Sequence, residues 1–124
     1  MGNPVTHWQI VSKDPEGAAG FYKELFGWNV DTANGLNYRM IDTQSDGRGI
    51  PGGIWPSPPE GHALVQLFVE VDDVAAASQR ATELGAAVVM PRQVLPDGDE
   101  MAIIHDAFGI TFGLWRKRSI IPEV

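Results

Sequence analysis

The fold is indicated most clearly by residues 10–27, which read IVSKDPEGAAGFYKELFG. The β-branched start is typical of a strand. Asp14 and Pro15 then form a typical helix start, because an Asp side chain accepts a free backbone N–H and proline at the first helical position gives up no hydrogen bond. Gly27 ends the pattern, since the left-handed residue after a helix is least costly as glycine. The stretch therefore predicts a strand followed by a helix.

Residues 68–85, which read FVEVDDVAAASQRATELG, repeat this pattern. The repeat keeps one offset of 58 positions (72 − 14 = 58), which aligns Asp14 with Asp72, Ala18-Ala19 with Ala76-Ala77, and Gly27 with Gly85. A strand, an Asp cap, a helix and a terminating glycine thus recur without an insertion. Two similar modules predict a pseudo-two-fold domain with a ligand cleft where the halves meet.

The rest of the chain completes two βαβββ modules. Asn34-Gly35 and Asp106–Gly109 predict hairpin turns, and the proline-rich stretch 56–61 predicts a linker. Strands are expected at residues 5–11, 28–31, 36–42, 52–55, 64–71, 87–90, 101–105 and 110–115, and helices at 15–26 and 74–84. We expect one α+β domain whose sheets form a half-open barrel around a central cavity. Its predicted parts are module one at 4–56, a linker at 57–62, module two at 63–118 and a loose tail at 119–124.

One helix face is predicted to be structural. Ala18, Phe21, Tyr22 and Leu25 follow the i, i+3, i+4, i+7 spacing of a single apolar stripe. We expect this stripe to pack the first helix on its sheet.

The composition is that of an ordinary globular domain. Of 124 residues, 44% are hydrophobic and 20% charged, and no apolar run approaches the roughly 20 residues of a transmembrane helix. The absence of cysteine and of a recognisable export signal favours a cytoplasmic protein. The net charge of −7 argues against nucleic-acid binding and favours cationic ligands. We therefore expect neither a nucleic-acid nor a membrane partner.

The motifs in both halves resemble those of one superfamily. In the first half these are HWQI at residues 7–10, Asp14-Pro15, Phe21-Tyr22 and LFGW at 25–28; in the second they are VDD at 71–73, ELGA at 83–86 and FGLW at 112–115 after the Asp106–Gly109 turn. This pattern resembles the vicinal oxygen chelate superfamily, which includes glyoxalase I, bleomycin-resistance proteins and extradiol dioxygenases. The resemblance covers nearly the whole chain.

The resemblance also implies where metal ligands would lie, one on each of four strands. His7 stands at the first position, and the third falls at or beside Gln66. The second falls on the strand Gly53–Trp55, and the fourth at Gly113, which has no side chain. Zn, Ni and Fe sites need three or more His, carboxylate or thiolate ligands. We therefore predict no bound metal or other cofactor, with a divalent metal as the alternative.

Candidate ligand-binding residues follow from strand alternation and from these family positions. His7 and Gln9 share one face of the first strand and either line the cavity or bond to neighbouring groups. Gln66 lies in an apolar strand and needs a hydrogen-bond partner if buried. The aromatic candidates for stacking are Trp55 and Trp115, with Tyr38 on the same wall. The predicted site is His7, Gln9, Tyr38, Trp55, Gln66 and Trp115, with no catalytic residue assigned.

Two main function classes remain. The first is a metal-free small-molecule binding protein, similar to the bleomycin-resistance branch, with an aromatic or cationic ligand. The second is an enzyme: a metal-dependent lyase or dioxygenase with an atypical ligand set, or a metal-free enzyme that uses His7 as acid and base. A structural or partner-binding domain is a third class. The resemblance also implies a homodimer, whose geometry the sequence leaves open.

Overall fold

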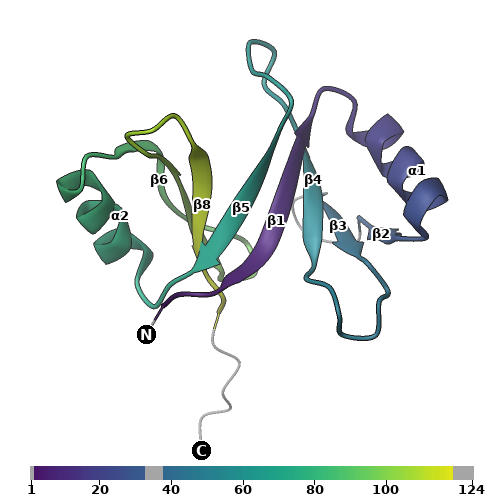
Figure 1. Ribbon diagram of the computed structural model, residues 1–124, viewed down its shortest axis with the longest axis horizontal. Coiled ribbons are helices and arrows are strands. Elements are labelled where there is room, and N and C mark those ends of the chain that lie inside the picture. The colour runs from purple at the N-terminus through teal and green to yellow at the C-terminus, as the bar shows by residue number, and fades with distance from the viewer. Residues whose placement is uncertain (1, 33–37, 119–124) are drawn as a thin grey trace, which may run out of the picture. The chain divides into compact units, whose positions relative to one another are not determined.

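The computed structural model describes residues 2–32 and 38–118 (Figure 1). The chain divides into two compact units. The N-terminal unit is Val5–Leu67, and the C-terminal unit comprises residues 68–118 with residues 2–4. The predicted Asn34-Gly35 turn, the start of the predicted strand 36–42 and the predicted tail lie outside the described residues. Within the described ranges, no helix is long and apolar enough to cross a membrane.

The N-terminal unit packs one helix against one face of a mixed sheet. The sheet order is β2-β3-β4-β1, with β1 parallel to β4 and the other pairs antiparallel. The parallel pair is possible because the chain between β1 and β4 is long enough to include a helix. The elements are β1 (Val5–Ser12), α1 (Pro15–Phe26), β2 (Asn29–Asp31), β3 (Arg39–Asp42) and β4 (Gly52–Pro56).

The C-terminal unit repeats this plan, with the strand order β5-β8-β7-β6 and β5 parallel to β8. In Figure 1 each helix lies against the strands of its own unit. Two βαβββ modules and the α+β class are thereby confirmed. The elements are β5 (Leu64–Glu70, shared between the units), α2 (Val74–Glu83), β6 (Ala87–Val94), β7 (Glu100–His105) and β8 (Thr111–Arg116).

The helix caps confirm the repeat but correct its alignment. Asp14 Oδ1 accepts the Gly17 N–H at 3.0 Å, and in α2 the equivalent acceptor is Asp73 Oδ1, 2.9 Å from the Ala76 nitrogen. The caps are therefore 59 positions apart (73 − 14 = 59), and the prediction that Asp14 aligns with Asp72 without an insertion is wrong. Two adjacent Asp residues are equally good caps by sequence, and only the start of the helix selects between them.

Both predicted helix stops are confirmed. Gly27 has φ +71° and Gly85 has φ +101°, values that side-chain-bearing residues rarely adopt. α1 has 12 residues and α2 has 10, because the helix starts are 59 positions apart (74 − 15 = 59) and the helix ends 57 (83 − 26 = 57).

Strand β6 is longer than predicted. The predicted strand ends at Met90, yet β6 continues through Pro91 to Val94. β6 is the outermost strand in the order of its unit, and a proline there removes no bond to a second neighbour. Its register with β7 shifts between Val88 and Met90 and again before Gln93. Bulges of this kind absorb the irregularity at an edge.

The predicted packing of α1 is only partly right. Ala18 and Tyr22 do pack on the core, but Phe21 and Leu25 are 59% and 58% exposed. Ala19 is the buried residue of the helix, so the contact face is rotated away from the predicted stripe. The N-terminal core is Ala19, Ile41 and Ile54 with Trp8, Ile10, Ala18, Tyr22, Trp28 and Val30; the C-terminal core is Val71, Val74, Ala102, Ile104 and Leu114.

Candidate functional site

Five of the six predicted site residues belong to the N-terminal unit. Trp8 and Ile10 of β1 pack towards α1, so alternation places His7 and Gln9 on the opposite face. Ile54 of β4 is likewise in the core, which places Trp55 on the side of His7. We call this surface the helix-distal face; it is made of His7, Gln9, Tyr38, Gly53, Trp55 and Gln66.

A histidine and a tyrosine meet on the helix-distal face. His7 is buried, and its Nε2 lies 3.1 Å from the Tyr38 hydroxyl oxygen. Burial raises the pKa of the Tyr38 phenol well above its ordinary value, so the hydroxyl keeps its proton at neutral pH. The hydroxyl can donate to an unprotonated Nε2 or accept from a protonated one. The hydrogen bond can therefore persist whether or not Nε2 carries a proton.

Gly53 makes room for this pair. A Cβ built at Gly53 would overlap the ring and hydroxyl of Tyr38, so the phenol lies directly on the backbone of β4. The indole of Trp55, two residues further along, has its ring centroid 5.7 Å from that of Tyr38. The structure thus brings together His7, Tyr38 and Trp55, three of the predicted site residues.

The two predicted amides form a pair of their own. Gln9 Nε2 donates to Gln66 Oε1 at 3.3 Å, and Gln66 is buried. Gln9 is therefore the hydrogen-bond partner that the buried amide of Gln66 requires. One donor and one acceptor are satisfied within the pair, and each amide group has further bonding capacity.

Trp115 stands apart from the other five because it belongs to the C-terminal unit. It lies on β8 with the Lys117 ammonium nitrogen 5.6 Å from its ring centroid, a distance typical of a cation–π contact. Two residues before it, the space beside Gly113 is filled by the Phe68 ring.

The residues at the implied ligand positions do not fit a divalent metal. Gly53 and Gly113 are covered by aromatic rings, and Gln66 is bonded to Gln9. Across residues 2–32 and 38–118, no three His, Cys, Asp or Glu side chains gather as a metal site. A single imidazole beside a phenol and two amides is a poor donor set for Zn, Ni or Fe.

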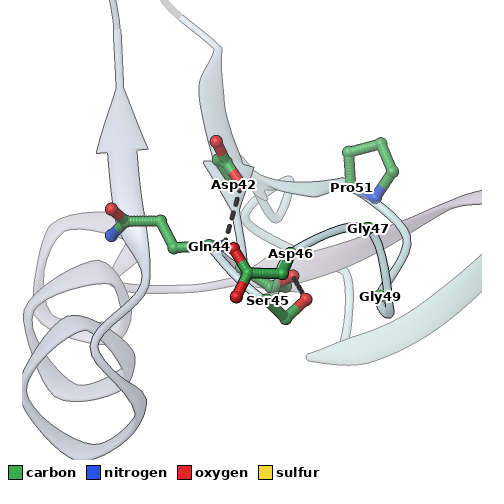
Figure 2. A pocket seen from close by; sticks show the side chains of 8 residues that line it. Asp42, Gln44, Ser45, Asp46, Gly47, Gly49 and Pro51 are labelled. Atoms are coloured by element: carbon green, nitrogen blue, oxygen red, sulfur yellow. Dashed lines mark hydrogen bonds between the residues drawn. The ribbon is translucent and has the colours of Figure 1, made fainter.

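Two hollows escaped the sequence prediction. A polar hollow of about 630 Å³ is formed by the loop between β3 and β4, where Gln44 and Asp46 have φ of +52° and +53° (Figure 2). An apolar hollow of about 400 Å³ adjoins it. Neither is lined by a predicted site residue. Asp46-Gly47 is a turn signal in the sequence, but such a signal does not indicate that the loop forms a hollow.

The chain matches a family model described as a glyoxalase-like domain over residues 8–115. Among curated proteins it is 31% identical over 122 residues to "Putative glyoxylase CFP32" of Mycobacterium bovis, and 28% identical over 129 residues to the anthracycline biosynthesis protein DnrV of Streptomyces peucetius. The alignments cover 94% and 89% of this chain and 46% of each relative. The chain thus spans about half the length of the curated relatives it matches.

Solved structures share the fold at low identity. Streptomyces coelicolor methylmalonyl-CoA epimerase in complex with 2-nitronate-propionyl-CoA has a TM-score of 0.68 at 17% identity, covering 94% of this chain and 99% of that one. A hypothetical protein from Bacillus halodurans has a TM-score of 0.72 at 13% identity, covering 99% and 100%. Together with the motifs in both modules, the match over residues 8–115 shows that this chain belongs to the glyoxalase-like domain family of the vicinal oxygen chelate fold.

Proposed function

We propose that this chain binds a small planar organic molecule on the helix-distal face, without a metal. The observation that carries the proposal is the cluster around Gly53, where Tyr38 lies on the backbone, His7 bonds to its hydroxyl and Trp55 lies beside it. The cluster combines polar groups that can orient a ligand with an aromatic wall that can stack on it.

The exposure of the aromatic groups supports a stacking role. Trp55 is 37% exposed although its ring lies beside that of Tyr38, so part of its indole is open to a ligand. The Gln9–Gln66 pair adds neutral donors and acceptors on the same face. With one imidazole and no carboxylate among these groups, affinity should depend mainly on shape and aromatic contact.

The relatives support a small organic ligand without fixing its identity. The Streptomyces peucetius relative is named for anthracycline biosynthesis, and anthracyclines are planar aromatic compounds. The epimerase structures hold acyl-CoA compounds. Since the chain covers about half of its curated relatives, their activities come to it as proposals.

A second candidate is an enzyme that transfers protons through His7. The 3.1 Å link between His7 Nε2 and the Tyr38 hydroxyl favours it, because a hydrogen bond at Nε2 fixes the orientation of the imidazole that would transfer the proton. Solvent-deuterium incorporation into a carbon acid such as methylmalonyl-CoA, abolished by His7→Gln, would support this candidate. Ligand binding without any such exchange would support the binding protein.

Binding is tested with a panel of fused-ring phenols and quinones, with acetyl-CoA included, by tryptophan fluorescence and calorimetry. We expect Trp55→Ala to weaken a bound compound by about 1–3 kcal/mol. Phe108→Ala, which removes an 88% exposed ring in the C-terminal unit, is the matched control. Trp115→Ala in the same assay tests the sixth predicted contact. Equal affinity of Trp55→Ala and the parent would place the ligand elsewhere.

We also propose that the chain forms a homodimer. Among the described strands of its unit, β6 has a single neighbour, and an eight-residue edge strand favours coverage by another chain. The doubled length of the curated relatives agrees with a second domain beside the first. Light scattering across a hundredfold range of concentration should give twice the chain mass, and a constant monomer mass would contradict the proposal.

A further inference from the structure

The apolar hollow lies on the opposite side of β1 from the helix-distal face. Trp8 and Ile10 line it, and both alternate with His7 and Gln9 along the strand. The hollow is therefore separate from the proposed stacking site. Among the described residues, the hollow is lined by Trp8, Ile10, Trp28, Thr43, Gly49, Ile50 and Val65.

The indole walls of this hollow are fixed in place. Trp8 Nε1 donates to the Ile50 carbonyl oxygen at 2.9 Å, and a Cβ at Gly52 would overlap the Trp8 ring. The Trp8 and Trp28 centroids are 5.3 Å apart, and Phe26 supports Trp28 from 4.9 Å. A ligand would meet preformed aromatic surfaces and would not have to order them.

Apolar atoms at the rim are left in water. Val65 is 66% exposed and Ile50 is 40% exposed, although both line the hollow. A volume of about 400 Å³ is within the range of small-molecule sites. Covering these walls with an apolar group would therefore be favourable.

The charged residues of the adjoining polar hollow indicate which charge a ligand would carry. The two hollows share Thr43 and Gly49, and the polar one is lined by the carboxylates of Asp42 and Asp46 (Figure 2). Arg48 is the basic residue of the same loop, so the loop has two negative charges against one positive. Indole faces also attract cations, and the whole chain carries −7. A carboxylate ligand is disfavoured here and an ammonium is favoured.

We propose that this pair of hollows binds a hydrophobic amine. The apolar body lies against the wall formed by Trp8, Trp28 and Val65, and the ammonium group lies towards Asp42 and Asp46. The site is independent of the helix-distal face and does not require the proposed function to be correct.

The test uses three probes with the same phenyl body: 2-phenylethylamine, 2-phenylethanol and phenylacetate. Calorimetry should rank the amine first, the alcohol second and the acid last. Val65→Lys places a cation at the rim and should weaken amine binding at least tenfold. Val89→Lys is the matched control, because Val89 is a 60% exposed strand valine in the C-terminal unit. Circular dichroism and thermal melting confirm that each variant is folded.

The charge assignment has its own variant. Asp42→Asn combined with Asp46→Asn should reduce the amine to the affinity of the alcohol and leave the alcohol unchanged. Equal binding of the three probes, or no effect of Val65→Lys, would overturn the proposal. Loss of amine binding in Trp55→Ala but not in Val65→Lys would also overturn it, while supporting the helix-distal face as the site.

Discussion

The two modules place a glycine at the same register position and use it differently. In the N-terminal unit Gly53 pairs with Gln9, and in the C-terminal unit Gly113 pairs with Phe68. Each glycine is covered by an aromatic ring. Over Gly53 the ring is Tyr38, from the segment before β3, whereas over Gly113 it is Phe68 itself.

This difference separates a site from a core. Because Gln9 leaves the space above Gly53 to a tyrosine, the first module gains a hydroxyl that bonds to His7. Phe68 is only 3% exposed, and its side chain has no polar group. At the same point, the second module is therefore filled by an apolar side chain, and we call it the closed module. The same repeated backbone therefore supports a candidate site in one module and a packed core in the other. The difference depends on which segment supplies the aromatic ring.

The largest expected effect on stability is at Phe68 in the C-terminal module, where the ring closes the space over Gly113. Phe68→Ala should lower the free energy of unfolding by about 3–5 kcal/mol, because it leaves a cavity over Gly113. Urea denaturation followed by circular dichroism measures it. A loss below about 1 kcal/mol would mean that the ring is not part of the core.

Stability should be nearly as sensitive to substitution of Gly53, the equivalent glycine of the N-terminal module, which we call the open module. Gly53→Ala forces the Tyr38 ring off the backbone, and overpacking of this kind costs about 1–3 kcal/mol. It should also break the hydrogen bond to His7, which NMR of the imidazole would detect. Ala102→Gly at a buried β7 position controls for the effect of an alanine–glycine exchange in a strand. An unchanged imidazole spectrum would show that the two rings are not coupled through Gly53.

A smaller effect is expected from the hydroxyl alone. Tyr38→Phe makes the open module resemble the closed one and removes one hydrogen bond, worth about 0.5–1.5 kcal/mol. The stability loss should therefore be modest, while the imidazole NMR signals of His7 shift. If the imidazole signals in Tyr38→Phe match those of the parent, the hydroxyl does not influence the imidazole.

The smallest expected effect concerns the carboxylate of Asp106 in the C-terminal module. The backbone N–H groups of Ile110 and Phe108 donate to Asp106, which lowers the pKa of that carboxyl below its ordinary 3.8. Its contribution to stability is therefore present above the unfolded pKa and lost as the pH falls through the folded one. Asp106→Asn should reduce the fall of the melting temperature as the pH drops below about 4. Parallel curves for Asp106→Asn and the parent would contradict this.

Local features could be predicted from the sequence, and features that depend on strand register could not. Asp14 and Gly27 mark the ends of α1 through bonds within a few residues, so they were readable. The choice of Asp73 over Asp72 and the rotation that exposes Phe21 depend on how each helix meets its sheet. The extension of β6 through Pro91 depends on its place at an edge.

The same distinction applies to the candidate site. Strand alternation and the family positions were enough to select His7, Tyr38 and Trp55. The bond between His7 and Tyr38 joins residues 31 positions apart and follows from the order β3-β4-β1, which no local pattern contains. The strands expected at 36–42 and 52–55 leave a loop between them, but the hollow that this loop forms depends on its conformation, including the left-handed Gln44.

The closeness of Trp8 and Trp28 gives the N-terminal unit an optical fingerprint. With centroids 5.3 Å apart and planes inclined at 44°, the two indoles should couple their electronic transitions and give a pair of bands of opposite sign in far-ultraviolet circular dichroism. Such a couplet depends on the mutual orientation of two side chains and not on helix content. It would report the packing of one half of the molecule without any added label.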